Sequence, residues 1–271
     1  MAKISVTSLS RGKSHLIVRD VHCAAACGET DVEDASEFSV ILPRRGVFLR
    51  GEGSGEPVVA NPAAALFSNP GDRYVFAHPI AGGDACTWIT LPPRFAEQLT
   101  APWAGRFPTA TVSIAASDQL KHYLLRSRIR AADGDDLETE EAAADLVAGL
   151  LNGHDQLMLA GVDARRLSRR VAEYLSVHYA ADAGLEAIAR AVGYTPHHLS
   201  RTYHRVTGRT ISGHRFALRC HAALARLADG ADDLNGVALA SGFYDHAHMA
   251  RCLKRSFGHP PSGLRSLLSP G

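Results

Sequence analysis

Four side chains in the N-terminal part of the sequence have the chemistry of a metal site. Cys23 and Cys27 are separated by three alanines. His78 and Cys86 lie on either side of a Gly-Gly pair, which predicts a tight hairpin that makes them neighbours. Three thiolates and an imidazole form a soft four-ligand set that suits zinc. Free cysteines are also common as small buried apolar residues, and thiols can sense redox state, so both remain alternatives to zinc.

A second set of chemically useful side chains is basic, and it repeats. When the C-terminal part is shifted against itself by 50 residues, Arg201 aligns with Arg251. The same shift aligns Gly208 with Gly258, and it aligns two copies of Ser-Gly-x-Arg. Apolar positions also coincide. Self-similarity of this density indicates one structural unit present twice.

Each unit predicts a pair of short helices. In the first, apolar residues at i, i+3, i+4 and i+7 predict a helix over 184–192, which Gly193 ends before Thr195 caps the next helix. In the second, Gly242 and Asp245 take the same two places. This is the helix-turn-helix plan, whose second helix enters the major groove of DNA. The two units span about 184–208 and 233–258, and about 210–228 predicts one continuous helix that would hold them at a fixed distance.

The outward face of each second helix is predicted to contact DNA, because an Arg there can bind guanine through two hydrogen bonds. In the first unit this face carries His197, Ser200, Arg201, His204 and Arg205. In the second it carries His246, Ala247, Ala250, Arg251 and Lys254. Ala247 and Ala250 offer only apolar contact, so the second unit is expected to read fewer bases. The alternative is two ordinary helical hairpins with solvated faces, against which the repeated arginine argues.

The charge distribution favours a polyanionic partner for the same part of the chain. The 271 residues carry a net charge of +1, but residues 165–271 carry +8 and residues 1–164 carry −7. Only the basic part is therefore expected to meet nucleic acid. The sequence has no apolar stretch of about 18 residues and no signal-peptide core, and its five cysteines are an odd number. A cytoplasmic protein without membrane contact or disulfides is expected.

The N-terminal part is predicted to be rich in β-structure. Short apolar runs bounded by Pro, Gly and Asn predict strands up to about residue 108, in a small barrel or sandwich. Helical spacing then predicts helices at about 113–131 and 139–159, which are expected to form a dimer interface or, alternatively, only to cover the barrel. A third helix begins near Asp163. The sequence therefore predicts an α+β chain with a sensing and dimerisation domain at 1–162 and a helical DNA-binding domain at 163–271.

Residues 167–268 resemble the DNA-binding domain of the AraC/XylS family of bacterial transcriptional regulators. The similarity is strongest over 242–258 and the His-Pro-Pro-Ser-Gly-Leu-Arg that follows. Met249 and Leu253 stand where the family usually has aromatic residues, and the usual Tyr near His214 and Leu264 is missing; these substitutions affect packing only. By position, the residues that match the family's base-reading places are His197, Ser200, Arg201, His246, Ala247, Ala250 and Arg251.

The resemblance also implies the remaining architecture and the partners. A cupin-like sensing barrel with dimerising helices is expected to precede the two helix-turn-helix units. The implied protein is a homodimeric activator that binds double-stranded DNA and RNA polymerase and responds to a small molecule or to zinc. No enzyme is expected, because the P-loop, the dinucleotide-binding glycines and the Gly-x-Ser-x-Gly elbow are missing from the sequence. The alternative is a cupin-type metal-binding protein or enzyme with a helical appendage, but residues 1–110 hold no His-x-His cluster.

Overall fold

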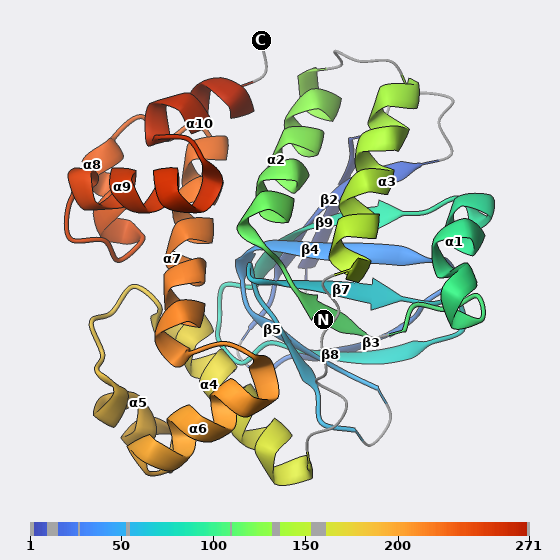
Figure 1. The fold of residues 1–271 in the computed structure, drawn as a ribbon. Helices are drawn as coiled ribbons and strands as arrows, with labels where there is room; N and C mark the ends of the chain where they lie inside the picture. Colours follow the sequence, from blue (N-terminus) through green and yellow to red (C-terminus); the bar gives the residue numbers. More distant parts are fainter. Residues whose placement is uncertain are drawn as a thin grey trace.

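A computed structural model of the chain describes residues 3–9, 16–26, 28–52, 55–108, 110–131, 136–152 and 161–269. A β-rich part is followed by a helical part, so the predicted α+β class is confirmed (Figure 1). The strands are β1 (Lys3–Ser8), β2 (Ile17–Ala24), β3 (Thr30–Asp34), β4 (Ser39–Gly46), β5 (Phe48–Gly51), β6 (Val58–Ala60), β7 (Ala64–Ser68), β8 (Arg73–Ala77), β9 (Asp84–Thr90) and β10 (Thr111–Ser113). The helices are α1 (Pro93–Thr100), the short η1 (Ala101–Trp103), α2 (Ala116–Ala131), α3 (Asp136–Asn152), α4 (Val162–His178), α5 (Leu185–Val192), α6 (Pro196–Thr207), α7 (Ile211–Ala228), α8 (Leu234–Ala240), α9 (His246–Phe257) and α10 (Pro261–Leu268).

The strands form two separate sheets, so the barrel that the resemblance implied is not a closed one. One sheet has six strands in the order β1-β2-β9-β4-β7-β10, and the other has four in the order β3-β8-β5-β6. The predicted hairpin between β8 and β9 is also wrong, because β8 pairs with β3 and β5 while β9 pairs with β2 and β4. The chain crosses from one sheet to the other between these strands. Among the described strands, none of the larger sheet is hydrogen-bonded to a strand of the smaller one, and the two sheets meet instead through apolar side chains such as Ile41 and Phe48.

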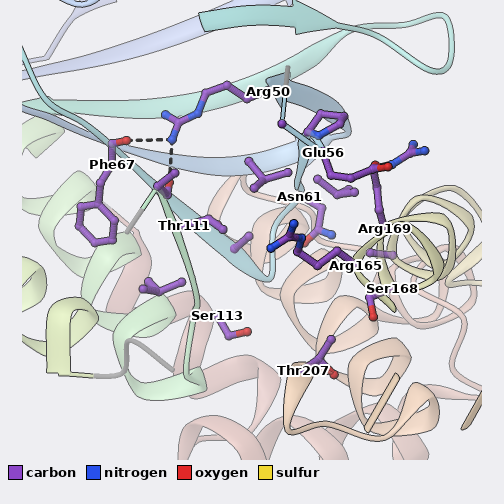
Figure 2. A pocket seen from close by; sticks show the side chains of 18 of the residues that line it. Arg50, Glu56, Asn61, Phe67, Thr111, Ser113, Arg165, Ser168, Arg169 and Thr207 are labelled. Atoms are coloured by element: carbon purple, nitrogen blue, oxygen red, sulfur yellow. Dashed lines mark hydrogen bonds and ion pairs between the residues drawn. The ribbon is translucent and has the colours of Figure 1, made fainter. Parts of the chain in front are cut away.

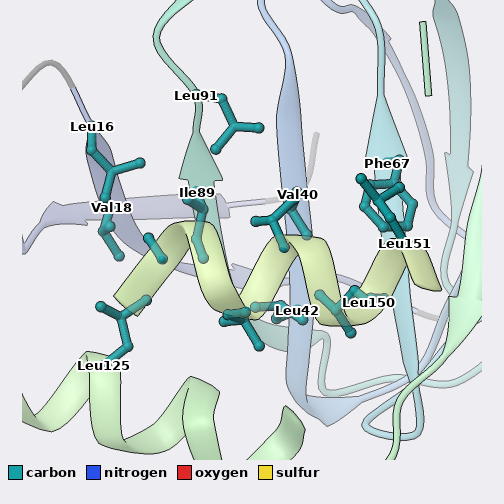
Figure 3. Close-up of a cluster of buried hydrophobic side chains, with 14 of the residues drawn as sticks. Leu16, Val18, Val40, Leu42, Phe67, Ile89, Leu91, Leu125, Leu150 and Leu151 are labelled. Carbon is teal, nitrogen blue, oxygen red and sulfur yellow. The ribbon is translucent and has the colours of Figure 1, made fainter. Parts of the chain in front are cut away.

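The central strands of the larger sheet are buried on both faces. In β4, Val40 and Leu42 face the helices, whereas Ile41 faces the second sheet. Figure 3 shows α3 lying across the strands with Leu150 and Leu151 against this face. Burying one such side chain contributes about 1.5–3 kcal/mol, so α3 is held mainly by its apolar stripe. Covering the sheet is compatible with both expectations for the helix pair, and the dimer interface stays a prediction.

Helix α2 has a second role that its sequence did not indicate. One side of it contacts the six-stranded sheet, and the other side lies against α7, α9 and α10 (Figure 1). Tyr123 of α2 is buried in the same apolar cluster as Leu253 of α9 and Leu264 of α10. Helix α2 therefore belongs to the core of the second helix-turn-helix unit as well as to the β-rich part.

The first unit has its own core, formed by α4, α5, α6 and α7. Leu167, Ile188 and Leu199 come together there, and Ala63 of the β-rich part joins them. Helix α4 begins at Val162, and the predicted division between 162 and 163 stays a prediction. Among the described residues, no helix combines the length and apolarity needed to cross a membrane. Helix α1 falls in the region predicted to be all β; its apolar positions Phe95, Ala96 and Leu99 pack against the sheet core.

Candidate nucleic-acid interface

The first helix-turn-helix unit consists of α5 and α6. Gly193 ends α5 with a φ of 79°, and its backbone N–H donates to the carbonyls of Ala189 and Arg190. Such a left-handed backbone is cheap only for glycine. Thr195 occupies the N-cap of α6 with extended backbone angles, but its side chain makes no capping hydrogen bond, and Pro196 begins the helix. The predicted helix–turn–helix is therefore present, and glycine and proline define its turn.

The second unit consists of α8 and α9. Gly242 follows α8 with a φ of 81°, and a Cβ built on it would lie 2.6 Å from the Cα of Ala180. Any larger residue would push the second unit away from the end of α4. Asp245 is the N-cap of α9, and its carboxylate accepts a hydrogen bond from the His248 backbone N–H at 2.6 Å. Asp at this position stabilises the start of the helix by about 1 kcal/mol.

The predicted outward faces point to solvent. On α6, Leu199, Tyr203 and Val206 are buried. The five residues predicted to meet DNA are exposed, namely His197, Ser200, Arg201, His204 and Arg205. On α9, the corresponding face has exposed Ala247, Arg251 and Lys254 and half-buried His246 and Ala250. The geometry is compatible with DNA contact, and contact itself stays a prediction.

The exposed basic side chains are available to phosphates and bases. Within the described part of the chain, Arg201, Arg205, Arg251 and Lys254 form no ion pair with an acidic side chain. Arg255 differs from its repeat partner Arg205, because its guanidinium packs over the ring of Phe216 at 4.8 Å. Among the described residues these four side chains are thus able to neutralise phosphate groups of a polyanion.

The arginine of the repeated Ser-Gly-x-Arg has a different place. In the first copy, Arg215 donates to the carbonyl of Ala183, just before α5. In the second copy, Arg265 pairs with Asp232, just before α8, at 3.1 Å. Each arginine thus fixes the segment that leads into its own unit, which favours the structural role for Arg215.

Sequence reasoning missed a further candidate on this surface. Tyr244 lies in the turn before α9 and is 85% exposed. Leu239 of α8, 65% exposed, is another large apolar side chain in solvent. The repeat could have revealed Tyr244, because the 50-residue shift aligns it with Tyr194. An exposed aromatic beside a recognition helix can contact a sugar or a base.

The two units are docked onto the β-rich part by polar contacts. His221 of α7 donates from Nδ1 to the carbonyl of Pro62 at 2.8 Å. Asn61 donates to the hydroxyl of Ser176 in α4 at 2.9 Å. Ser127 of α2 donates to the carbonyl of Leu268 at 2.9 Å. Changes in the β-rich part can therefore reach both units through direct contacts.

A cavity of about 610 Å³ lies where the β-rich part, α4, α6 and α7 meet (Figure 2). Arg50, only 2% exposed, donates to the carbonyls of Phe67 and Ala110 at 2.8 and 2.7 Å. The Nε of Arg50 and the hydroxyl of Ser168 are buried without a partner among the described residues. Further lining cations are Arg106, Arg165, Arg169 and Arg209. Glu52, Glu56 and Asp72 also line the cavity, and Arg106 and Arg169 are paired with Asp72 and Glu56. The cavity is wide enough for a small molecule.

The predicted metal ligands are only partly brought together. Cys23 and His78 lie near each other, and the side chain that joins them is Asp84: one potential ligand atom from each of the three lies within 4.8 Å of the others. Cys86 is buried instead behind Asp84, to which its thiol donates at 3.0 Å. Cys27 lies outside the described residues. In the structure β9 pairs with β2, and Cys23 lies opposite Asp84 in that pairing. Asp84 was missed because the sequence analysis paired β9 with β8 instead.

The described helices agree with a known domain family. A family model described as a helix-turn-helix domain matches residues 188–266. The C-terminal part of the chain is therefore an AraC-type helix-turn-helix domain, as the sequence resemblance predicted. No match was found among curated protein sequences.

Several solved structures are similar to the chain. ToxT from Vibrio cholerae O395 is 11% identical, with 96% of this chain and 100% of that chain covered and a TM-score of 0.39. Unsaturated fatty acid bound ToxT from Vibrio cholerae strain SCE256 is 10% identical, with coverage of 94% and 96% and a TM-score of 0.37. The AraC-like transcriptional activator CuxR is 13% identical, with coverage of 79% and 78% and a TM-score of 0.44.

Proposed function

We propose that the chain is a sequence-specific DNA-binding transcriptional regulator that reads DNA with α6 and α9. The observation that carries this proposal is the repeated helix-turn-helix unit with Arg201 and Arg251 exposed and unpaired at the same place. An arginine near the N-terminal half of a recognition helix can reach a base edge in the major groove. The basic charge of residues 165–271 supports the same partner.

Replacing Arg201 by Ala is expected to weaken binding to the specific site by about 1–3 kcal/mol, or roughly 5–150-fold, and to relax preference at one or two base pairs. The specific site is first obtained by selection from a random DNA pool. Arg251→Ala measures how much the second unit reads. Arg94→Ala is the matched control, because this exposed arginine lies on α1, on the side of the sheet remote from the helix-turn-helix units (Figure 1).

Electrophoretic mobility shifts at fixed salt, on the selected site and on scrambled DNA, separate base reading from phosphate contact. An equal loss of affinity for both DNAs would indicate that Arg201 contacts phosphates instead of bases. If Arg201→Ala and Arg251→Ala both keep wild-type affinity and sequence preference, the assigned faces of α6 and α9 are wrong.

We further propose that the regulator is a homodimeric activator that contacts RNA polymerase, as the family resemblance implies. Because α2 is packed on both sides within one chain, the outer face of α3 is the part of the predicted dimer surface that is free to meet a second copy. Sedimentation as a monomer at micromolar concentration, with and without DNA, would contradict the dimer.

The signal is proposed to be a small molecule with an acidic group, bound in the cavity of Figure 2. Support comes from Arg165 and Arg209, which line the cavity and form no ion pair among the described residues, and from the Nε of Arg50, which is buried without a partner there. Ser113 is an exposed lining residue, so Ser113→Trp should narrow the cavity without unfolding the chain. Native mass spectrometry of freshly purified protein should show an acidic small molecule with wild type and not with this variant. If wild type and Ser113→Trp both retain the small molecule, the ligand binds outside this cavity.

A further inference from the structure

The group formed by Cys23, His78 and Asp84 lies between the two sheets and is independent of the DNA-binding surface. Cys23 comes from the end of β2, Asp84 from the start of β9 and His78 from the segment that follows β8. One ligand atom from each lies within 4.8 Å of the others. His78 Nε2 is 2.9 Å from Asp84 Oδ1. A thiolate, an imidazole and a carboxylate are the three ligand types that zinc takes in proteins.

We propose that these three side chains bind one divalent transition-metal ion of the zinc class, with a fourth position open to an adjoining cavity. In a tetrahedral site, nitrogen and oxygen ligands about 2.0–2.1 Å from zinc lie about 3.3 Å apart. The present His78–Asp84 hydrogen bond is only slightly shorter than that separation. The His78–Asp84 pair is therefore already close to the separation that the ion requires. Binding would release two protons, the one shared by His78 and Asp84 and the thiol proton of Cys23.

The backbone holds the three ligands in place. Cys23 and Asp84 are direct partners in the antiparallel β2–β9 pairing, so their side chains emerge on the same face. Gly83 lets the strands approach, because a Cβ built on it would lie 1.7 Å from the carbonyl oxygen of Cys23. The backbone of His78 is held by two hydrogen bonds. Its N–H donates to the backbone carbonyl of Glu29 at 3.2 Å, and its carbonyl accepts from the backbone N–H of Gly28 at 2.8 Å. A site built on paired strands is already ordered before the ion arrives.

In this proposal Cys86 does not bind the ion but orients the carboxylate of Asp84. Its thiol donates to Asp84 Oδ2 at 3.0 Å, while Asp84 Oδ1 faces His78. One carboxylate oxygen is thus oriented by a buried donor and the other is directed to the metal position. Hydrogen bonds of this kind to a ligating carboxylate tune metal affinity.

The surroundings favour a cation and leave room for an exogenous ligand. A cavity of about 460 Å³ adjoins the three ligands. Besides Asp84, it is lined by the carboxylates of Glu29, Asp31 and Glu33, against a single lining arginine, Arg19. Apolar side chains complete its walls, chiefly Val21, Phe48, Phe76 and Trp88. Three protein ligands with an open fourth position next to such a cavity match a site that exchanges water for a ligand.

The test uses the full chain without DNA, so its outcome is independent of the proposed regulatory function. Cobalt(II) is added to chelator-treated protein, because cobalt replaces zinc and shows a thiolate charge-transfer band only when a cysteine binds it. Zinc is then measured by elemental analysis after equilibrium dialysis. Wild type should bind about one ion per chain and show the band. Cys220→Ala is the matched control, since it removes another buried cysteine far from the site and should change neither result.

Cys23→Ser should abolish the cobalt band, and Asp84→Asn should remove the bound zinc. Cys86→Ala should weaken binding by about 10–100-fold without abolishing it. Circular dichroism confirms that each variant is folded. The proposal is overturned if wild type binds no cobalt or zinc at micromolar concentration, or if folded Cys23→Ser and Asp84→Asn bind the ion like wild type.

Discussion

Replacing Asp20 by Asn is expected to lower the free energy of unfolding by about 3–5 kcal/mol. Asp20 lies on β2 and receives two hydrogen bonds from Arg126 of α2, at 3.0 and 2.6 Å. Arg44 of β4 approaches the same carboxylate at 3.2 Å. All three residues are at most 6% exposed. Without Asp20, two buried guanidinium groups would face each other with no counter-ion.

The pKa values of this cluster agree with that picture. Burial by itself raises the pKa of Asp20, but the hydrogen bond from Arg126 and the charge of Arg44 outweigh it, so the pKa lies below its usual value. Burial, together with the charge of Arg126, lowers the pKa of Arg44. The carboxylate is therefore held ionised between two cations that could not otherwise remain buried side by side.

Chemical denaturation followed by circular dichroism measures the effect. Arg126→Met should cost less than Asp20→Asn, because Asp20 then keeps Arg44 as its partner. Asp34→Asn is the control, since the Asp34–Arg73 pair is exposed and its loss should cost at most about 1 kcal/mol. A loss below 1 kcal/mol for Asp20→Asn would contradict the prediction. Tyr123 of α2 belongs to the core of the second helix-turn-helix unit. Asp20→Asn should therefore destabilise that unit as well.

The helical part was predictable from the sequence because its signals are local. Apolar spacing, Gly193, Gly242 and the cap at Asp245 each act within one or two helical turns, and the observed helices begin and end within a few residues of the prediction. The exposed positions of Arg201 and Arg251 followed from the same spacing. Repetition strengthened each signal, since every feature could be checked against its copy.

The β-rich part was predictable only in its strand content. Strand partners are set by contacts far apart in the sequence, so the neighbouring β8 and β9 were paired by proximity although each belongs to a different sheet. For the same reason Cys86, and not Asp84, was predicted to lie with Cys23 and His78. The double packing of α2 was missed for a related reason: Tyr123 and Leu125 lie on two apolar faces, and a sequence does not tell which partner each face meets.

Lowering the pH from 7.5 to 5 is expected to remove about 2 kcal/mol of stability for each of three buried histidines, or roughly 6 kcal/mol in all. His122 of α2 is fully buried, and its Nε2 lies 2.9 Å from the Thr87 hydroxyl. His221 donates to the carbonyl of Pro62, and His214 is hydrogen-bonded to the Tyr203 hydroxyl. The first two lie in the contact between the β-rich part and the helices, and His214 lines the cavity there.

Each of these imidazoles is held neutral. Burial, followed by the charges of Arg44 and Arg126, lowers the pKa of His122 to about 3. Burial, followed by the charge of Arg209, lowers the pKa of His214 to about 3. Burial also lowers the pKa of His221 to about 4, although its hydrogen bond to Pro62 acts in the opposite direction.

The sign follows from proton uptake. In the unfolded chain a histidine titrates near pH 6.5, so between that value and pH 3–4 the unfolded state binds protons that the folded state does not. The stabilisation is complete above about pH 6.5 and is lost progressively as the pH falls. Carboxylates with lowered pKa, such as Asp20, act in the same direction but below about pH 5. The loss of stability between pH 6.5 and 5 is therefore attributed to the three buried histidines.

Urea denaturation at pH 7.5, 6.5, 5.5 and 5.0 tests this dependence. His221→Gln should keep a donor to Pro62 and remove about 2 kcal/mol from the difference between pH 7.5 and pH 5. His204→Gln is the control, because His204 is exposed on α6 and its replacement should leave the pH dependence unchanged. Equal free energies of unfolding at pH 7.5 and 5 would show that these imidazoles are not held neutral. Because His221 of α7 is hydrogen-bonded to Pro62 of the β-rich part, the first effect of acid should be separation of the helix-turn-helix units from the sheet, visible as faster proteolysis.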